Sequence, residues 1–328
     1  MEYLFAPMEG ITGYVFRNAH HRHFHGIKEY YTPFISPNQT RKLTPRELQD
    51  VLPEHNEGIP VIPQILTNKA DDFLWAAERL KELGYREANL NLGCPSGTVV
   101  AKKRGSGFLE YPVALDEFLY RVSDGIERLD MEWSIKTRIG KSDPEEFEEL
   151  LSNRYSLKNL IIHPRVQTDY YKNHPHMEAF ALAEQESKNP VIYNGDLFCG
   201  DDIKRFADAY PKVSAVMLGR GLLTNPALAE DAARLSETDK GTLLTAARIR
   251  AFHEDVLEGY RKAIPGDKNV LFKMKELWTY LGEAFEDSAK PMKKIRKAQR
   301  MEEYRAAVEA LLLEKPVCSV PKFPGWNR

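Results

Sequence analysis

The chain has 328 residues, of which 42% are hydrophobic and 29% are charged, and its formal net charge is −2 at pH 7. A chain of this length can bury a large core, and its balanced charge excludes an intrinsically disordered class. No run of 18 apolar residues occurs, so we expect no membrane-spanning helix. Glu2, Pro7 and Glu9 interrupt any apolar segment at the start, so we also expect no signal peptide.

The three cysteines, Cys94, Cys199 and Cys318, include no CxxC pair. An odd and sparse set argues against a disulfide framework and against a structural zinc site. We therefore expect no metal and a cytoplasmic, reducing environment.

Eight short apolar runs alternate with longer segments of helical periodicity. The runs cover residues 3–7, 26–31, 60–65, 87–92, 132–137, 158–163, 190–193 and 215–218, and helical segments follow them, as at 68–83, 112–129 and 200–209. This alternation indicates right-handed βαβ units and a parallel sheet. Eight units predict an α/β protein with a (β/α)₈ barrel, and a doubly wound open sheet, which needs fewer strands, is the alternative.

After residue 235 the pattern changes to helices alone, over 242–262, 268–287 and 290–313. We predict three parts: a catalytic barrel over residues 1–239, a small helical domain over 240–313 and an extended, proline-containing tail over 314–328. Residues 240–328 hold 18 Lys and Arg against 12 Asp and Glu, whereas the rest of the chain holds 28 against 36. A basic part of this kind suits a polyanion, but charge alone favours an ordinary solvated helix surface.

Polar residues cluster just after the predicted strands, where (β/α)₈ barrels carry their active sites. The last two loops, Asn194-Gly195-Asp196 and Gly219-Arg220, predict a phosphate site with Arg220 as a clamp, and two ordinary glycine turns are the alternative. Lys136 is placed to stabilise negative charge or to extend along the barrel rim. Gln64 offers a donor and an acceptor to a heterocycle or to a neighbouring strand.

Cys94 lies in a loop of small residues with Lys102, Lys103 and Arg104 downstream. Positive neighbours favour a thiolate nucleophile, whereas a general acid must keep its proton, and the sequence leaves both open. An inert buried cysteine is the third reading. Cys199 and Cys318, which lack such surroundings, fit that third reading.

Taken together, several motifs resemble those of the tRNA-dihydrouridine synthases. They are Ala6-Pro7-Met8-Glu9-Gly10-Ile11-Thr12, Asn91-x-Gly93-Cys94-Pro95, Lys136-x-Arg138-x-Gly140, His163-x-Arg165, Asn194-Gly195-Asp196 and Met217-x-Gly219-Arg220-Gly221. The resemblance runs in order through about residues 3–300. In that family an FMN-containing barrel carries a C-terminal helical bundle that helps to hold tRNA.

The resemblance implies a role for each matching residue. FMN would be bound by Pro7, Met8, Glu9, Gln64, Lys136, His163, Asn194, Gly195, Asp196, Gly219 and Arg220. Asn91 would touch the target uracil, and Cys94 would donate a proton to C5 while flavin N5 delivers hydride to C6. NADPH would restore the reduced flavin, and the target base would swing out of the folded RNA.

The resemblance also gives the basic residues a purpose. The substrate or RNA would be contacted by Lys102, Lys103, Arg104, Arg165, Lys172, Lys290, Lys293, Lys294, Arg296, Lys297 and Arg300. Two alternatives remain: an FMN barrel that reduces a small unsaturated molecule, as dihydroorotate or enoate reductases do, and an RNA-binding module on an inactive barrel.

Overall fold

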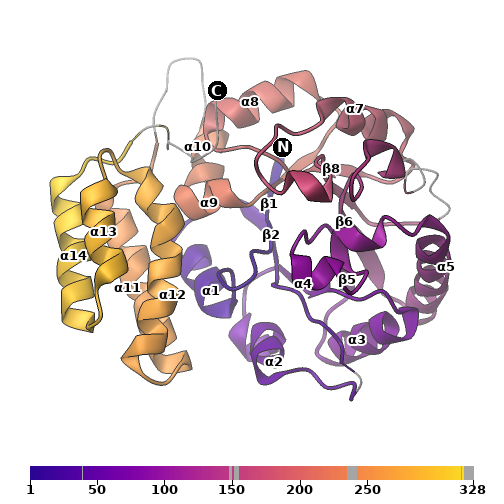
Figure 1. Ribbon diagram of the computed structural model, residues 1–328, viewed down its shortest axis with the longest axis horizontal. Helices are drawn as coiled ribbons and strands as arrows, with labels where there is room; N and C mark the ends of the chain where they lie inside the picture. The colour runs from indigo at the N-terminus through magenta and orange to yellow at the C-terminus, as the bar shows by residue number, and fades with distance from the viewer. Residues whose placement is uncertain (39, 148–149, 151–154, 235–241, 319, 321–328) are drawn as a thin grey trace. The chain divides into compact units, whose positions relative to one another are not determined.

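The computed structural model describes residues 1–38, 40–147, 150, 155–234, 242–318 and 320 (Figure 1). Contacts divide the chain into two compact units. The first unit comprises residues 1–7, 28–195 and 211–217, and the second comprises 8–27, 196–210 and the described part of 218–328. The predicted boundary at residues 239 and 240, and most of the predicted tail, lie outside the described residues.

The first unit is built on one parallel sheet. Its strands are β1 (Glu2–Phe5), β2 (Ile27–Tyr31), β3 (Val61–Ile62), β4 (Gln64–Ile65), β5 (Glu87–Leu92), β6 (Glu132–Arg138), β7 (Leu160–His163), β8 (Val191–Tyr193) and β9 (Ala215–Leu218). Their spatial order is β3-β2-β1-β9-β8-β7-β6-β5-β4. Each of the eight predicted apolar runs contains a strand. The strand order confirms the predicted barrel and not the alternative, an open doubly wound sheet.

The barrel closes at Pro63, which separates β3 from β4. The strand β3 pairs with β2, and β4 pairs with β5. Proline has no N–H, so the ladder is interrupted there, but the Pro63 carbonyl still accepts the Asn89 N–H at 2.9 Å. One predicted run, 60–65, therefore forms two short strands that join the two ends of the sheet.

Helices accompany the strands of the first unit. They are α2 (Pro45–Val51), α3 (Ala70–Glu82), α4 (Gly97–Val100), α5 (Pro112–Arg128) and α7 (Met177–Glu186). The predicted helices at 68–83 and 112–129 are confirmed as α3 and α5, which lie side by side (Figure 1). Phe73 of α3 meets Phe118 of α5 edge to face, with ring centroids 6.4 Å apart.

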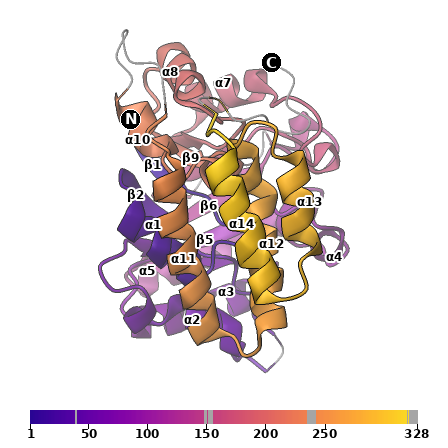
Figure 2. The same cartoon turned by 90° about the vertical axis from the view of Figure 1, so that its left-hand side faces the viewer.

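The second unit is helical. It contains α1 (Tyr14–His23), α8 (Gly200–Ala209), α9 (Arg220–Thr224), α10 (Leu228–Arg234), α11 (Ala246–Ala263), α12 (Asp267–Leu281), α13 (Ala289–Lys297) and α14 (Met301–Glu314). The helices α11 to α14 run side by side (Figures 1 and 2). The helix predicted over 290–313 is wrong in one respect, because it breaks into α13 and α14. The Glu303 carboxylate accepts the backbone N–H groups of Gln299 and Arg300 and so starts a new helix there.

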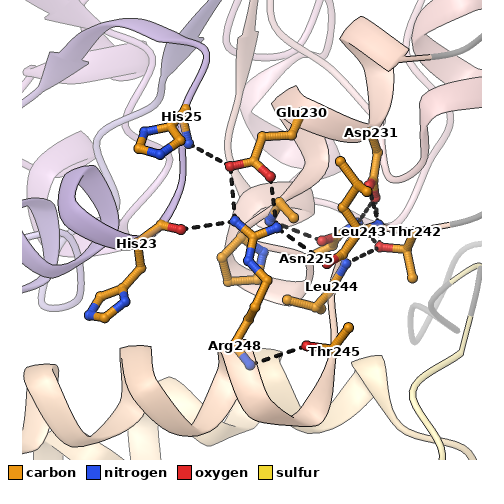
Figure 3. A network of polar contacts seen from close by, with 12 residues as sticks. His23, His25, Asn225, Glu230, Asp231, Thr242, Leu243, Leu244, Thr245 and Arg248 are labelled. Carbon is orange, nitrogen blue, oxygen red and sulfur yellow. Dashed lines mark hydrogen bonds and ion pairs between the residues drawn. The ribbon is translucent and has the colours of Figure 1, made fainter.

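An ion pair joins three of these helices (Figure 3). The Arg248 guanidinium of α11 donates to both carboxylate oxygens of Glu230 in α10, at 2.7 and 2.9 Å. It also donates to the carbonyl of His23, at the end of α1, at 2.9 Å. Glu230 in turn accepts the His25 N–H at 2.8 Å. A planar guanidinium with several satisfied donors fixes the relative positions of these helices more firmly than a single point charge could.

A buried polar node lies among α11, α12 and α14. The Trp278 indole N–H donates to the Tyr304 hydroxyl at 2.8 Å, and that hydroxyl lies 2.7 Å from His253 Nε2. Because the indole can only donate, we assign the tyrosine proton to the bond with His253. All three side chains are buried. The hydroxyl therefore satisfies two groups that have no access to water.

We expect Tyr304→Phe to lower the free energy of unfolding by about 1–3 kcal/mol, because it leaves a buried donor and a buried acceptor without partners. Tyr120→Phe is the control, since Tyr120 is 66% exposed. Its expected effect is within about 0.5 kcal/mol. Urea denaturation followed by circular dichroism measures both. Equal stabilities for the two variants would contradict the assigned role of the node.

Candidate functional site

A ladder of polar side chains runs along the inside of the barrel. Strand β5 places Glu87, Asn89 and Asn91 on one face, because alternate residues of a strand point the same way. Lys158 donates to Glu87 at 2.7 Å, and the Ser134 hydroxyl donates to the other oxygen of Glu87 at 2.6 Å. Asn89 Nδ2 then donates to Ser134 at 2.9 Å. This series starts near the beginning of β5 and leads toward its carboxyl end.

Gln64 continues the ladder to the Cys94 loop. Its Nε2 donates to Asn89 at 2.7 Å, and its Oε1 accepts from Asn91 Nδ2 at 2.7 Å. The Asn91 Oδ1 then accepts the backbone N–H groups of Gly93 and Cys94, at 3.0 and 2.9 Å. Gln64 is completely buried and Asn91 is nearly so. The described contacts of Gln64 are thus with the neighbouring strand, the alternative weighed from the sequence.

The Cys94 loop is held from its other side by the segment that follows it. The Cys94 carbonyl accepts the Ser106 hydroxyl at 2.9 Å and the Ser106 N–H at 3.2 Å. Gly105 has a φ of +56°, and a Cβ there would lie 2.7 Å from the Cys94 carbonyl oxygen. Only glycine permits this close approach. Cys94 as a whole is half-buried.

Lys136 has the features of an active-site cation, namely no ion-pair partner among the described residues and a lowered pKa. It lies in β6 at the level of Asn91, its partner in the pairing register. Among the described residues its ammonium has no hydrogen-bond acceptor and no carboxylate within ion-pairing distance. Burial lowers the pKa of Lys136 from 10.5 to about 7, with a further lowering by Arg138, while Cys94 raises it. An unpaired lysine with this pKa can stabilise negative charge when it is protonated, and it can accept a proton when it is neutral.

The next strand end forms a compact cluster with buried guanidinium groups. Arg138 is 1% exposed and donates to the carbonyls of Val166 and Tyr170, at 2.8 and 2.7 Å. Arg165, also 1% exposed, donates to the Asn173 carbonyl and lies 2.9 Å from His163 Nε2. The structure thus brings His163 and Arg165 together and turns Arg165 inward. No role is predicted for Arg138 from the sequence, although its place at the end of a predicted strand was a usable signal.

Other predicted residues of the first unit lie at strand ends or in the loops that follow them. The Asn194 amide donates to the Met217 carbonyl at 2.7 Å. A Cβ on Gly195 would lie 2.0 Å from the Tyr193 hydroxyl. Pro7, two residues after the end of β1, is half-buried. Lys172 is exposed on the loop after β7.

The second unit holds the other predicted residues of the same kind. Arg220 lies 2.6 Å from Asp196, and the side chains of this ion pair are 16% and 11% exposed. Gly219 precedes Arg220 as the residue before α9, and a Cβ on the next residue, Gly221, would meet the Leu197 carbonyl at 2.2 Å. This crowding explains the glycine after the arginine.

The loop that carries Met8 and Glu9 is braced from the helical part of the same unit. Met8 N–H donates to the Thr12 hydroxyl at 2.8 Å. Lys273 of α12 donates to the Gly10 carbonyl at 2.5 Å. Gly10 has a φ of +83°, a conformation that favours glycine.

The basic side chains form two separate groups. On α13 the apolar residues are buried, while Lys290, Lys293, Lys294, Arg296 and Lys297 are exposed and have no carboxylate within ion-pairing distance among the described residues. Arg300, which follows, pairs with Glu303 at 2.8 Å. In the first unit, Lys103 lies over the Tyr111 ring and Arg104 donates to Ser36. Within the described chain, no helix is long and apolar enough to span a membrane, and no cluster of metal ligands occurs.

Comparisons with known proteins agree on the class of this site. The family model for dihydrouridine synthase (Dus) matches residues 4–314. The chain therefore belongs to the dihydrouridine synthase family, a family of flavin-dependent oxidoreductases. A probable tRNA-dihydrouridine synthase 2 from Bacillus subtilis is 26% identical over 276 residues, or 79% of each chain. A probable tRNA-dihydrouridine synthase from Staphylococcus epidermidis is 27% identical over the same length and coverage.

Solved structures show the same fold at much lower identity. Morphinone reductase matches 73% of this chain and 87% of its own, with a TM-score of 0.51 and 15% identity. Histamine dehydrogenase from Rhizobium sp. 4-9 matches 87% of this chain and 51% of its own, with a TM-score of 0.54 and 11% identity. These likenesses support the barrel architecture.

The depressed pKa of Lys136 predicts a pH dependence of stability. The unfolded lysine, with its ordinary pKa of 10.5, binds more protons than the folded one between pH 7 and 10.5. The contribution of Lys136 to the free energy of unfolding is therefore fully present above pH 10.5 and is lost as the pH falls to about 7. Relative to Lys136→Met, the unmutated protein should gain about 3 kcal/mol between pH 7 and pH 9.5.

Urea denaturation of ligand-free protein at the two pH values measures this difference. Lys102→Met, which removes an exposed lysine, is the matched control. A constant difference between the unmutated protein and Lys136→Met would show that Lys136 titrates as a free lysine does.

Proposed function

We propose that this protein is an FMN-dependent enzyme that reduces the C5–C6 double bond of a uridine in tRNA to dihydrouridine. The observation that carries the proposal is the position of Cys94, half-buried on a loop that Asn91 and Ser106 hold, beside the unpaired Lys136. A fixed acid next to a site for negative charge is what addition of hydride and a proton to a pyrimidine requires. Family membership supports the reaction.

In each unit, the residues that the family resemblance assigns to FMN have side chains or backbone positions that suit this group. In the first unit, Lys136 is an unpaired cation suited to an electron-rich ring, and Asn194, Gly195, Gln64, Pro7 and His163 are the residues that the family resemblance assigns to FMN. In the second unit, Arg220 with Gly219 and Asp196, and the Met8–Glu9 loop, are the corresponding residues. When bound, reduced FMN would supply a hydride to C6 of the uracil, and NADPH is the reductant that we assign to it.

Cys94 acts as the general acid in this proposal. The sequence left open whether positive neighbours would make it a thiolate. Burial lowers the pKa of Lys136 to about 7, so Lys136 is a weaker positive neighbour for the thiol than an ordinary, permanently charged lysine. The Asn91 amide, through the Gly93 and Cys94 N–H groups, fixes the loop so that the thiol can deliver that proton to C5.

The tRNA is the partner that the basic surfaces suit. Five unpaired cations on the exposed face of α13 can neutralise phosphates, and Lys102, Lys103 and Lys172 add exposed cations on the segments that follow α4 and β7. Arg300, paired with Glu303, and the buried Arg165 contribute less directly, and we assign Arg165 to holding His163. Because tRNA is the substrate, we place the protein in the cytoplasm.

We expect Cys94→Ala to keep its flavin absorption but to lose most dihydrouridine formation, by about 10²- to 10⁴-fold, because one general acid is removed. Incubation of unmodified tRNA with protein, FMN and NADPH, followed by mass-spectrometric mapping of dihydrouridine, measures this. Cys318→Ala is the control and should retain activity. If the unmutated protein makes no dihydrouridine but reduces free pyrimidines or enones, its substrate is a small molecule. If the protein stays colourless with added FMN, the hypothesis of a flavin enzyme is wrong.

A charge reversal tests the face of α13. Replacing Lys293, Lys294 and Lys297 with Glu should weaken tRNA binding and flatten its salt dependence, because fewer counterions are released from the RNA. Fluorescence anisotropy over a series of salt concentrations gives the slope. Flavin content should stay unchanged. An unaltered slope would mean that RNA does not contact this surface.

A further inference from the structure

A hollow of about 560 Å³ in the first unit has a positively charged lining that brings together residues far apart in the sequence. It is lined by Ser36, Pro37, Asn38, Arg41, Lys69, Asp72, Lys102 and Arg104. These residues come from three segments: the loop after β2, the start of α3, and the loop after α4. Asp72 is the one carboxylate among the described lining residues.

The four cations of this hollow are uncompensated. Among the described residues, none of Arg41, Lys69, Lys102 and Arg104 has a carboxylate within ion-pairing distance. Surface cations at this density raise a local positive potential, and a concave wall of protein concentrates it. The hollow is therefore built to attract an anion rather than to balance charge within the protein.

An adjoining hollow shows the contrast. It has the same volume, about 560 Å³, and shares Arg41, Lys69 and Asp72. There, however, Arg121 pairs with Asp71 at 2.5 Å, and Lys103 lies 4.3 Å from the centre of the Tyr111 ring. Its remaining cations are thus engaged by the protein. Free positive charge is concentrated in the first hollow.

The positive hollow lies next to the Cys94 loop. Arg104 donates to Ser36 at 3.0 Å, and Asn68 Nδ2 donates to the Lys102 carbonyl at 3.2 Å, which fixes this segment. A Cβ on Gly105 would lie 3.1 Å from the Cys94 Cβ. Adding one bond and one step between neighbouring Cα atoms places the Arg104 Cα within about 9 Å of the Cys94 Cβ.

We propose that this hollow, formed by Arg41, Lys69, Lys102 and Arg104, binds a phosphodiester group of the RNA strand that flanks the nucleotide presented to Cys94. The inference rests on the proposed function and adds Arg41 and Lys69 to its RNA contacts. A base that leaves its stack must have its backbone held on at least one side. A phosphate held beside the Cys94 loop meets that requirement.

The chemistry of the lining favours RNA over a nicotinamide dinucleotide, which also carries phosphates. Such a cofactor needs a surface for its rings as well as for its phosphates. No aromatic side chain is among the described residues that line the hollow, and Pro37 is its one apolar residue. A phosphate whose sugar and base lie outside the hollow fits this lining better.

The test compares two double charge reversals in the full-length flavin-bound protein. The hollow variant is Arg41→Glu with Lys69→Glu, and both side chains are exposed, so folding should not depend on them. The control is Arg86→Glu with Lys212→Glu, which makes the same change of charge at two exposed residues that precede β5 and β9 and so lie at the other ends of those strands. A milder variant, Arg41→Gln with Lys69→Gln, gives a graded comparison. Each is titrated with unmodified tRNA at several salt concentrations.

We expect the hollow variant to bind tRNA at least about 10-fold more weakly, with the slope of log affinity against log salt reduced by about one. The glutamine variant should lie between it and the unmutated protein. The control should bind as the unmutated protein does, and the KM for NADPH should be the same in all of them. Equal tRNA binding by the hollow variant and the control would overturn the inference.

Two further results separate the possible failures. If the hollow variant raises the KM for NADPH and leaves tRNA binding unchanged, the hollow holds a dinucleotide phosphate, and the inference is wrong. If the unmutated protein itself neither binds nor modifies tRNA, the proposed function is wrong. If the unmutated protein is active and the hollow variant binds tRNA as the control does, only the inference about the hollow is wrong.

Discussion

The buried hydrogen-bonded ladder of β5 is the constraint on which the proposed chemistry depends. A (β/α)₈ barrel is ordinarily filled with branched apolar side chains. Here Leu4, Ile161, Ile192 and Met217 belong to such a cluster, but one strand contributes Glu87, Asn89 and Asn91 to the interior. Polar groups at such depth are tolerated only when they are satisfied, and each bond of the ladder therefore fixes the next. The last member, Asn91, positions the Cys94 backbone.

Close backbone contacts hold the loops around this ladder. Gly105 lets one segment lie directly against the Cys94 carbonyl, and Gly10 lets the loop after β1 turn so that Lys273 can reach its carbonyl. In the second case a helix more than 250 residues away in the sequence supports a loop that the family resemblance assigns to the flavin. The C-terminal helices thus have a structural role in addition to the proposed contact with tRNA.

Unpaired charge distinguishes the proposed binding surfaces from ordinary solvated ones in this protein. Many surface cations pair locally, as Arg79 does with Glu82 and Arg128 with Asp124, and such exposed pairs contribute little. The cations of α13, those of the hollow beside the Cys94 loop and Lys136 have no such partners among the described residues. Composition alone could not separate these cases, because it counts charges without their neighbours.

Local patterns in the sequence determined the eight strands, the helices α3, α5 and α8, the change to an all-helical C-terminal part and the motifs of the family. These features could be predicted because periodicity and motif spacing depend on residues close together in the chain. The tertiary structure alone decided that Gln64 bonds to Asn89 and Asn91, that Arg165 turns inward to His163, that Pro63 closes the barrel, and that Arg41 and Lys69 join Arg104 around one hollow. Those contacts join residues from separate strands and loops, and a side chain's hydrogen-bond partners and pKa follow from what surrounds it in space.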